Sequence, residues 1–258
     1  MTKQEEDEII LQFFFYAWET YDLMPAITNC HQYVTLDTSD DQIIFIRKVT
    51  ESLPENPKIA HFYTCSDWLL YKSEIVKSRL AHFFGKSKKL HGRDCEVKRI
   101  DAHLASEFLS RNHLHGPLTG KYKYGLFHKK IGLVGVATFA QARNFKKEDQ
   151  TIVSSEMLAL SLALGYSVVG GFQKLLQAHI RDRRPDEIMT YSDLDLGKHN
   201  IYRYIGFQSK GITEPKCFTV DEKGNRTYSK KYSEPNSPHT GFEYRNQGFE
   251  KWVLTIES

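Results

Sequence analysis

The sequence predicts a fold of the α/β or α+β class, in which helices cover the faces of a mixed central sheet. Segments with the alternation of strands follow segments with helical periodicity along most of the chain. Hydrophobic residues occupy 40% of the 258 positions and charged residues 26%, while the net charge is only +3. A chain of this size and composition buries a substantial core, which excludes a mainly disordered protein.

The composition excludes further classes of protein. No apolar run approaches the roughly 18–20 residues of a membrane-spanning helix, so we expect no membrane partner. The beginning, MTKQEEDE, is polar and acidic, unlike a secretory signal. The cysteines are far apart and form no CxxC pair, which argues against a zinc site or a disulfide framework: they are Cys30, Cys65, Cys95 and Cys217. We therefore expect a cytoplasmic protein.

The chain is expected to divide near residue 90 into segments 1–90 and 91–258. Segment 1–90 is predicted as a small α/β unit, with a helix at about 4–18, strands at 42–49 and 58–63, and a helix at about 72–84 that ends at Gly85. The basic run 86–93 predicts a solvated linker, with a phosphate-contacting patch as the alternative.

Segment 91–258 predicts a longer series of strands and helices. The apolar face Phe172, Leu175, Leu176, His179 and Ile180 has the spacing of a helix. The predicted elements are strand 95–100, helix 102–114, hairpin 122–129 and 130–140, strand 155–163, the helix around 172–180, strand 187–194, helix 197–207, and strands near 216–221 and 251–256.

The strongest local pattern is SEMLALSLALGYSVVGGFQKLL at 155–176, an apolar strand that leads into two glycines and an amphipathic helix. Adjacent glycines let the main chain turn sharply and approach a ligand closely. The first N–H groups of the next helix and its dipole favour an anion. The pattern therefore fits a pyrophosphate cradle, or else a strand-to-helix turn whose glycines serve packing.

The order of elements and IYRYIGF at 201–207 resemble the GNAT acyltransferases over roughly 93–258. The resemblance implies that the glycine turn binds the pyrophosphate of acetyl-CoA or another acyl donor. It also implies that Tyr202 protonates the departing thiolate, where the alternative is a tyrosine packed on the sheet. In this family the turn usually begins with Gln or Arg and has one residue between its glycines. In this sequence the turn begins with Ser167, and its two glycines are adjacent. The implied cradle is Val168, Val169, Gly170, Gly171 and Phe172.

A narrower resemblance rests on FLSRNHLHG (108–116), YGLFHKKIGLVGVATFAQAR (124–143) and TYSDLDLGKHNIYRYIGF (190–207). These segments are similar to a phage-associated GNAT-like domain of Mom-type DNA-modification proteins and certain homing endonucleases. The resemblance implies a catalytic iron held by His113 and Asp193, where the alternative for His113 is a structural loop contact. It also implies that residues 1–90 are the remnant of a nuclease.

Two further candidates come from the residues themselves. Glu156 lies on an apolar strand, as either an ion-pair partner of Arg143 or a general base. The basic stretch 77–93 and the aromatic, basic stretch 227–245 fit DNA phosphates and an unstacked base, with ordinary surface loops as the alternative. DNA is therefore the expected partner.

The sequence as a whole leads to a functional hypothesis. It predicts a phage- or prophage-linked GNAT-like acyltransferase that modifies a nucleic acid base in the host cytoplasm, with His113, Glu156, Asp193 and Tyr202 at the reacting end. The alternatives are a non-catalytic DNA-binding module derived from a homing endonuclease and a small-molecule N-acetyltransferase. Similarity of fold alone does not distinguish these functions.

Overall fold

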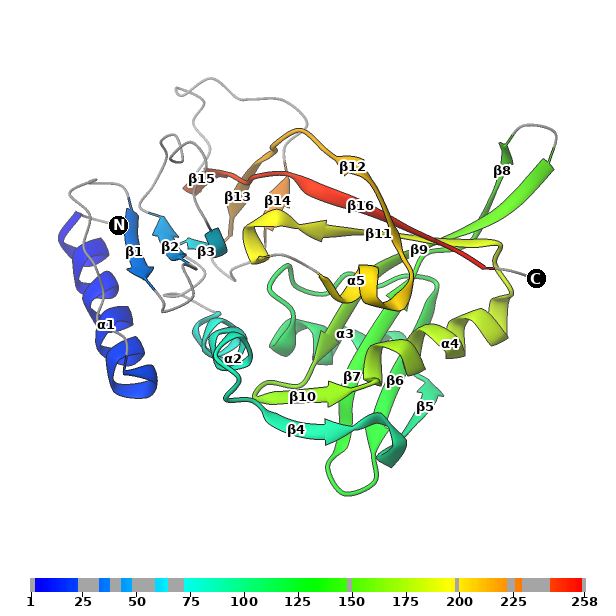
Figure 1. The fold of residues 1–258 in the computed structure, drawn as a ribbon, viewed down its shortest axis with the longest axis horizontal. Helices are drawn as coiled ribbons and strands as arrows, with labels where there is room; N and C mark the ends of the chain where they lie inside the picture. Colours follow the sequence, from blue (N-terminus) through cyan, green and yellow to red (C-terminus); the bar gives the residue numbers. More distant parts are fainter. Residues whose placement is uncertain are drawn as a thin grey trace. The chain divides into compact units, whose positions relative to one another are not determined.

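The computed structural model describes residues 3–22, 33–37, 43–47, 59–64, 72–147, 150–197, 200–221, 226–228 and 242–256. The chain forms two compact units (Figure 1). The first unit comprises Met1–Val76, Asp193–Lys198 and Thr213–Phe249, and the second comprises Lys77–Ser192, His199–Ile212 and Glu250–Ser258. Among the helices that the structure describes, none is long and apolar enough to cross a membrane.

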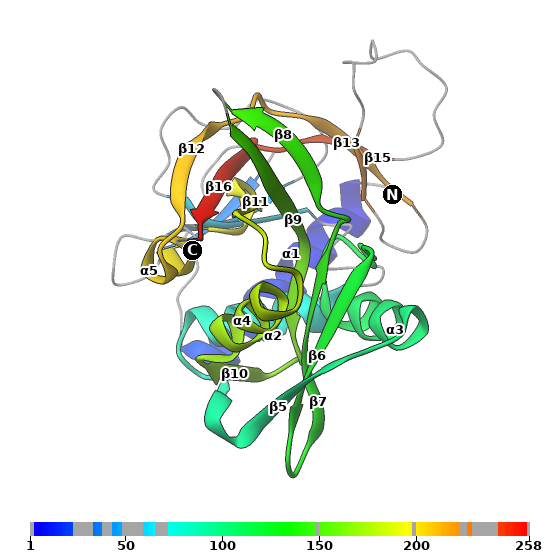
Figure 2. The ribbon, with the colours of Figure 1, turned by 90° about the vertical axis from the view of Figure 1, so that its right-hand side faces the viewer.

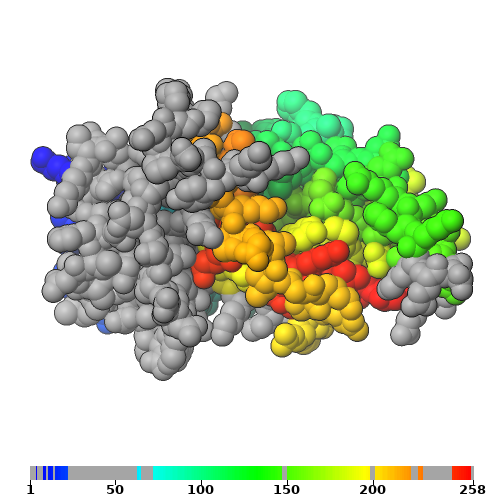
Figure 3. Space-filling view, turned by 90° about the horizontal axis from the view of Figure 1, so that it is seen from above, coloured from blue at the N-terminus to red at the C-terminus, as the bar shows by residue number. Residues whose placement is uncertain are grey.

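The second unit is built on an eight-stranded mixed sheet. Seven of its strands follow the order β12-β16-β11-β9-β7-β6-β5, and the eighth, β8, pairs with β9. In the space-filling view, α5 and β12 (yellow to orange) and β16 (red) lie at the surface of this unit (Figure 3). The strands are β5 Cys95–Arg99, β6 Tyr122–His128, β7 Gly132–Phe139, β8 Arg143–Lys147, β9 Gln150–Leu162, β11 Glu187–Asp193, β12 Gln208–Ile212 and β16 Phe249–Thr255. The predicted fold class is thereby confirmed.

Helices α3 (Ala102–Asn112) and α4 (Gly171–Arg183) lie on opposite faces of this sheet (Figure 2). Asp101 begins α3, because its carboxylate accepts a hydrogen bond of 2.8 Å from the amide of Leu104. The short helix α5 (Asn200–Ile205) precedes β12.

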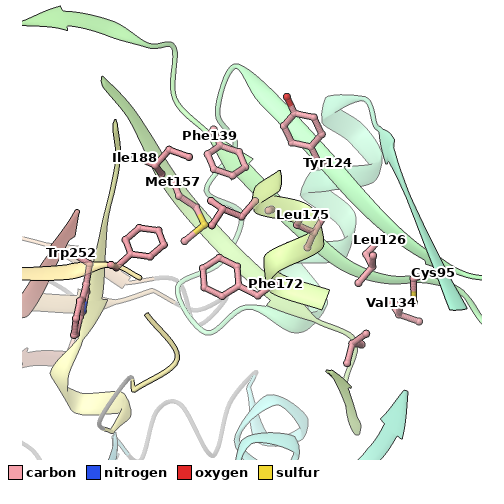
Figure 4. Close-up of a cluster of buried hydrophobic side chains, with 14 residues drawn as sticks. Cys95, Tyr124, Leu126, Val134, Phe139, Met157, Phe172, Leu175, Ile188 and Trp252 are labelled. Atoms are coloured by element: carbon pink, nitrogen blue, oxygen red, sulfur yellow. The ribbon is translucent and has the colours of Figure 1, made fainter. Parts of the chain in front are cut away.

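The main core lies between α4 and the sheet. Phe172 and Leu175 of α4 pack with Phe139, Met157 and Trp252 of the strands (Figure 4). A smaller cluster joins α3 to the other face of the sheet through Ala105, Phe108, Leu109, Val136 and Ala159. The apolar periodicity of both helices is thus explained by burial on the two faces.

The basic run at 86–93 is not a linker, and that prediction is wrong. Residues Lys88–His91 form strand β4, which pairs in parallel with β10 (Tyr166–Val169). Leu90 packs against the main core, which fixes the strand. A short turn of 3-10 helix, Gly92–Asp94, follows, and a Cβ at Gly92 would lie 3.0 Å from the carbonyl oxygen of Val169.

The first unit contains helix α1 (Lys3–Tyr21) and two three-stranded sheets, with orders β1-β2-β3 and β14-β13-β15. Helix α2 (Ser73–Phe83) begins in this unit and ends in the second. The strands are β1 Tyr33–Asp37, β2 Ile43–Arg47, β3 Ile59–Thr64, β13 Cys217–Val220, β14 Arg226–Tyr228 and β15 Phe242–Arg245. The two units thus divide the chain at residues other than the predicted boundary near 90. The interpretation of residues 1–90 as the remnant of a nuclease stays a prediction.

A histidine lies in the core between α4 and the sheet. His179 is fully buried, and its ring stacks on Phe139 with 3.8 Å between the centroids. Its Nε2 lies 2.9 Å from Ser155 Oγ. Burial lowers the pKa of His179 to about 4, so the folded protein holds a neutral imidazole at neutral pH.

This lowered pKa predicts an acid-sensitive stability. The unfolded imidazole binds a proton below its ordinary pKa of 6.5 and the folded one only below about 4, so stability falls as the pH drops through that window. Between pH 7 and pH 5 we expect His179 to account for about 2 kcal/mol of the loss. Urea unfolding at both pH values should show that the free energy of unfolding of H179Q falls less between pH 7 and pH 5 than that of the wild type, by this amount.

The control is H103Q, which changes an exposed histidine of α3. It should keep the pH dependence of the wild type. An unchanged pH dependence in H179Q would contradict the assignment.

Candidate active site

The central strands β9 and β11 pair only over the first three residues of β11. Parallel pairing joins residues 187–189 of β11 to residues 154–156 of β9, and the described residues show no further pairing although both strands continue. Figure 1 shows the two strands diverging beyond this point. We call the region where they separate, between residues 157–162 of β9 and 190–192 of β11, the strand splay.

A bulge in β9 lies at the beginning of the strand splay. Thr138 of β7 pairs with Ala159, but the next residue, Phe139, pairs with Met157, so Leu158 is an extra residue. Met157 packs in the core beneath α4, whereas Ala159 packs with α3. The bulge therefore changes which side chains of β9 face each helix.

The glycine turn lies at the beginning of α4, and its two glycines have different physical reasons. Gly170 has a φ of +74°, in the left-handed region, and no described atom lies within 4 Å of where its Cβ would be. A Cβ at Gly171 would lie 3.0 Å from side-chain atoms of Leu126 and Val168. Close packing thus explains the glycine at 171. The glycine at 170 is explained by its left-handed main-chain conformation, and it faces open space.

The first turn of α4 presents main-chain donors. Lys174 N–H donates to Gly170 O at 3.1 Å, which is the first helical bond. The amides of Gly171, Phe172 and Gln173 precede it and have no acceptor among the described residues. Together with the helix dipole they favour an anion at this end of α4.

Basic side chains of β4 lie beside this turn. The register places Lys89 next to Ser167 and His91 next to Val169, at the spacing of neighbouring strands. Both alternate with the inward-facing Leu90, so they lie on the outward face. No ion pair within the described residues involves the exposed cations Lys86, Lys88, Lys89 and Arg93. This stretch therefore adds positive charge near the start of α4.

Tyr202 of α5 lies in an aromatic environment. Its ring centroid is 5.7 Å from that of Phe172 and 5.6 Å from those of Phe207 and Trp252. Burial raises the pKa of Tyr202 to about 12, against the smaller lowering by a hydrogen bond with Thr190 and by the charge of Arg79. The phenol is therefore protonated at neutral pH and is held beside the first residue of the strand splay.

Glu156 lies on the opposite face of the sheet from Tyr202. Ser155 points toward α4, where it bonds to His179, so its neighbour Glu156 points to the α3 face. The pairing of Glu156 with Met189 places Tyr191, two residues further along β11, on the same face, where 40% of Tyr191 is exposed. The structure shows no ion pair between Glu156 and Arg143, both of which it describes, so the expected pairing is not formed.

His113 ends α3 on that same face. Its Nδ1 lies 3.1 Å from Gly116 O, and its ring centroid lies 5.6 Å from that of His115. The preceding residue, Asn112, accepts a hydrogen bond of 2.8 Å from Ser161 Oγ of β9. His113 is thus anchored beside the second half of β9, and its loop contact with Gly116 agrees with the structural alternative.

Asp193 belongs to the first unit and has structural partners there. Its Oδ1 accepts a hydrogen bond of 3.0 Å from the amide of Asp195, and its Oδ2 lies 3.5 Å from Arg226 Nη1 and 3.4 Å from the hydroxyl of Tyr228. Both side chains of the Asp193–Arg226 pair are buried. This arrangement neutralises the carboxylate within its own unit.

The predicted iron site does not fit these residues. Asp193 is already bonded to an amide, a guanidinium and a phenol. Within the described residues no group of three or more metal-binding side chains occurs.

Several residues of the site escaped the sequence analysis. These residues are Thr190 and Tyr191 of β11. Nothing in the sequence marks them as site residues, because only the position at which β9 and β11 separate sets them apart from the rest of the strand. The aromatic stretch at 227–245 lies largely outside the described residues. Its expected contact with a base stays a prediction.

Comparisons with known proteins give structural similarity alone. No protein-family model and no curated protein matches the chain. The structure is similar to the spermidine N-acetyltransferase SpeG from Vibrio cholerae, with a TM-score of 0.42 and 10% identity over 63% of this chain and 94% of that protein. The ribosomal-protein-S5-alanine acetyltransferase from Vibrio fischeri gives 0.41 and 11%, over 64% and 94%.

A third similar structure is a NatC complex bound to a Gag peptide and CoA, with a TM-score of 0.38 and 14% identity over 64% of this chain and 99% of that one. At these values the similarity is distant. The geometry of the site itself therefore carries the functional conclusion.

The contacts of Asp193 predict a structural role for this residue. D193N removes the charge that compensates the buried Arg226, so we expect the free energy of unfolding to fall by about 3 kcal/mol. Chemical denaturation measures this loss, and E187Q, at the start of the same strand, should be nearly neutral. Iron(II) should not raise the melting temperature of the wild type. A stable D193N variant, or specific stabilisation by iron(II), would restore the metal hypothesis.

Proposed function

We propose that this protein is an acyltransferase that uses an acyl-CoA thioester. The strand splay is the observation that carries the proposal. Beyond Met157, the side of β9 that faces β11 has no partner strand among the described residues. Unpaired peptide groups of this kind require hydrogen-bond partners. An extended donor with amide groups, such as the pantetheine arm of CoA, supplies them.

The glycine turn supports the same donor. A pyrophosphate at the start of α4 would accept hydrogen bonds from the amides of Gly171, Phe172 and Gln173. Lys89 and His91 of β4 stand beside the strand that leads into this turn. Lys89 would add positive charge for the phosphate groups of the donor, and His91 a ring N–H group. Val168 and Phe172, which the sequence also predicted for the cradle, serve it by packing in the core and fixing the turn.

The chain's own residues divide the acyl transfer between the two faces of the sheet. An acceptor nitrogen attacks the thioester carbonyl, the carbon–sulfur bond breaks, and the sulfur takes the proton of Tyr202 on the α4 face. On the α3 face, Glu156 takes the proton that the acceptor nitrogen loses. Tyr202 then regains a proton from solvent. The raised pKa of Tyr202 keeps the phenol protonated for this role.

We further propose that the acceptor is the amino group of a nucleic acid base. Tyr191 is a partly exposed aromatic ring on the same face as Glu156, and such rings stack on unpaired bases. The resemblance to phage DNA-modification domains supports the same acceptor, as does the basic stretch 77–93. Lys86 and Lys88 of this stretch would hold backbone phosphates, with the salt dependence typical of such contacts.

The glycine turn gives a direct test of donor binding. G170V should weaken CoA binding at least tenfold in isothermal titration calorimetry, because the side chain would occupy the open space beside the first amides of α4. The matched control is G165V: Gly165 has a φ of +77° and equally open surroundings. Both variants should lose about 1–3 kcal/mol of stability from backbone strain. Equal CoA affinity in the two variants would contradict the cradle.

The complete activity is tested by incubating the protein with acetyl-CoA and single-stranded DNA, and analysing the released nucleosides by mass spectrometry. We expect acylated adenine or cytosine, with kcat lowered about 10²-fold in Y202F and in E156Q, the range of general acid–base catalysis. Y204F, which changes the highly exposed tyrosine of α5, is the control. Transfer to polyamines alone would indicate a small-molecule acetyltransferase. CoA release without any acylated product would contradict acyl transfer.

A further inference from the structure

Lys174 of α4 joins the glycine turn to the connection between β4 and β5. Its main-chain N–H closes the first helical bond, to Gly170 O. Its ammonium group donates a hydrogen bond of 3.0 Å to Gly92 O and a second one to Cys95 O. These carbonyls stand at the two ends of the 3-10 turn Gly92–Asp94. One half-buried residue thus holds both the beginning of α4 and the turn that follows β4.

The 3-10 turn lies in close contact with the glycine turn. A Cβ at Gly92 would lie 3.0 Å from Val169 O and 3.2 Å from the carbonyl carbon of Gly170. The pairing of His91 with Val169 leads directly into this contact. Gly92 therefore permits an approach of two main-chain segments that a larger residue would prevent.

Other contacts of the 3-10 turn fix it to the sheet. Lys129, which follows β6, donates to Asp94 Oδ1 at 2.6 Å, and Cys95 packs in the main core. Among the described residues, no side chain other than Lys174 makes a hydrogen bond that joins this turn to α4. The position of the turn relative to the first amides of α4 therefore depends on Lys174.

We propose that Lys174 is a positioning residue for acyl-CoA, which holds the end of β4 against the glycine turn. This inference rests on the proposed function. The contact fixes Lys89 and His91 beside the first amides of α4 before the donor arrives. A site whose parts are already ordered loses less free energy when its ligand binds. Lys174 acts through the main chain of Gly92 and Cys95 and takes no part in proton transfer.

This role affects binding and leaves the chemistry unchanged. Hydrogen bonds from an ammonium group are about twice as strong as those between neutral groups, so their loss should loosen the contact between the two turns. The phosphate groups of the donor are held alike before and during acyl transfer. Loss of Lys174 should therefore raise the KM for acyl-CoA and leave kcat unchanged. A merely structural lysine would affect stability without this separation of KM from kcat.

The experiment measures CoA binding by isothermal titration calorimetry and acyl transfer by steady-state kinetics. K174M should raise the Kd for CoA about tenfold, with kcat within twofold of the wild type. K174Q, a milder change that removes only the charge of the donor group, should weaken CoA binding severalfold. K174R keeps the charge and the donors, and its affinity should stay within about threefold of the wild type.

The matched control is K123M. Lys123 of β6 is also half-buried, and its Nζ donates to a main-chain carbonyl, that of Lys121 at 3.3 Å, which lies outside β4, β10 and the glycine turn. K123M removes the same charge from the protein and should bind CoA like the wild type. Thermal unfolding of each variant shows whether it is folded.

A second change reaches the same contact from the side of β4. G92A places a methyl group against Val169 O, so it should also weaken CoA binding. Because both changes loosen one contact, the Kd of the double variant G92A/K174M should rise by less than the product of the two separate increases.

The outcomes separate this role from the proposed function. Wild-type affinity for CoA in K174M or K174Q, or the same loss in K123M, would overturn the role of Lys174 and leave the proposed function intact. A fall in kcat at unchanged KM would also overturn it. A wild type that binds no CoA would instead refute the proposed function, and the role of Lys174 would fall with it.

Discussion

The extra residue at Leu158 is the constraint on which the candidate site depends. A regular β9 would keep the same side chains on each face and could pair along its length with both neighbours. The bulge turns Met157 toward α4 and Ala159 toward α3, while β7 remains paired with β9 on both sides of it. Bulges of this kind bend a strand and increase its twist. The separation of β11 from β9 begins at the same place, so one inserted residue creates both the gap and the two chemically different faces beside it.

The elements with one buried face were predictable, and the exposed strands were not. Helix α4 and the hairpin of β6 and β7 show clear periodicity because the core selects apolar residues at regular intervals. All residues of β12 are exposed, and three of the four residues of β4 are. Strands of this kind are held by main-chain pairing with a neighbour, which leaves no apolar alternation in the sequence. For the same reason the lysines of β4 were interpreted as a linker.

The candidate site was predictable where it depends on local chain geometry. A glycine pair between a strand and a helix, and a tyrosine before Gly206, are visible in the sequence, although the structure gives the two glycines different roles. Partnerships across strands were not visible. Arg226 neutralises Asp193 from a distant strand, and Met157 faces Thr190 from the neighbouring one. Only the register between elements brings such residues together, so the partners of Asp193 and of Thr190 could not be predicted from the sequence.

The parallel pairing of β4 with β10 also constrains how the protein folds. Lys88 and Tyr166 are paired although roughly 80 residues of chain separate them, and contacts between distant residues close slowly. During synthesis β4 emerges well before its partner, so its lysine-rich segment stays unpaired until the central strands of the sheet and the glycine turn have been made. The glycine turn is therefore flanked by its cations only at a late stage of folding, after the sheet that it serves has formed.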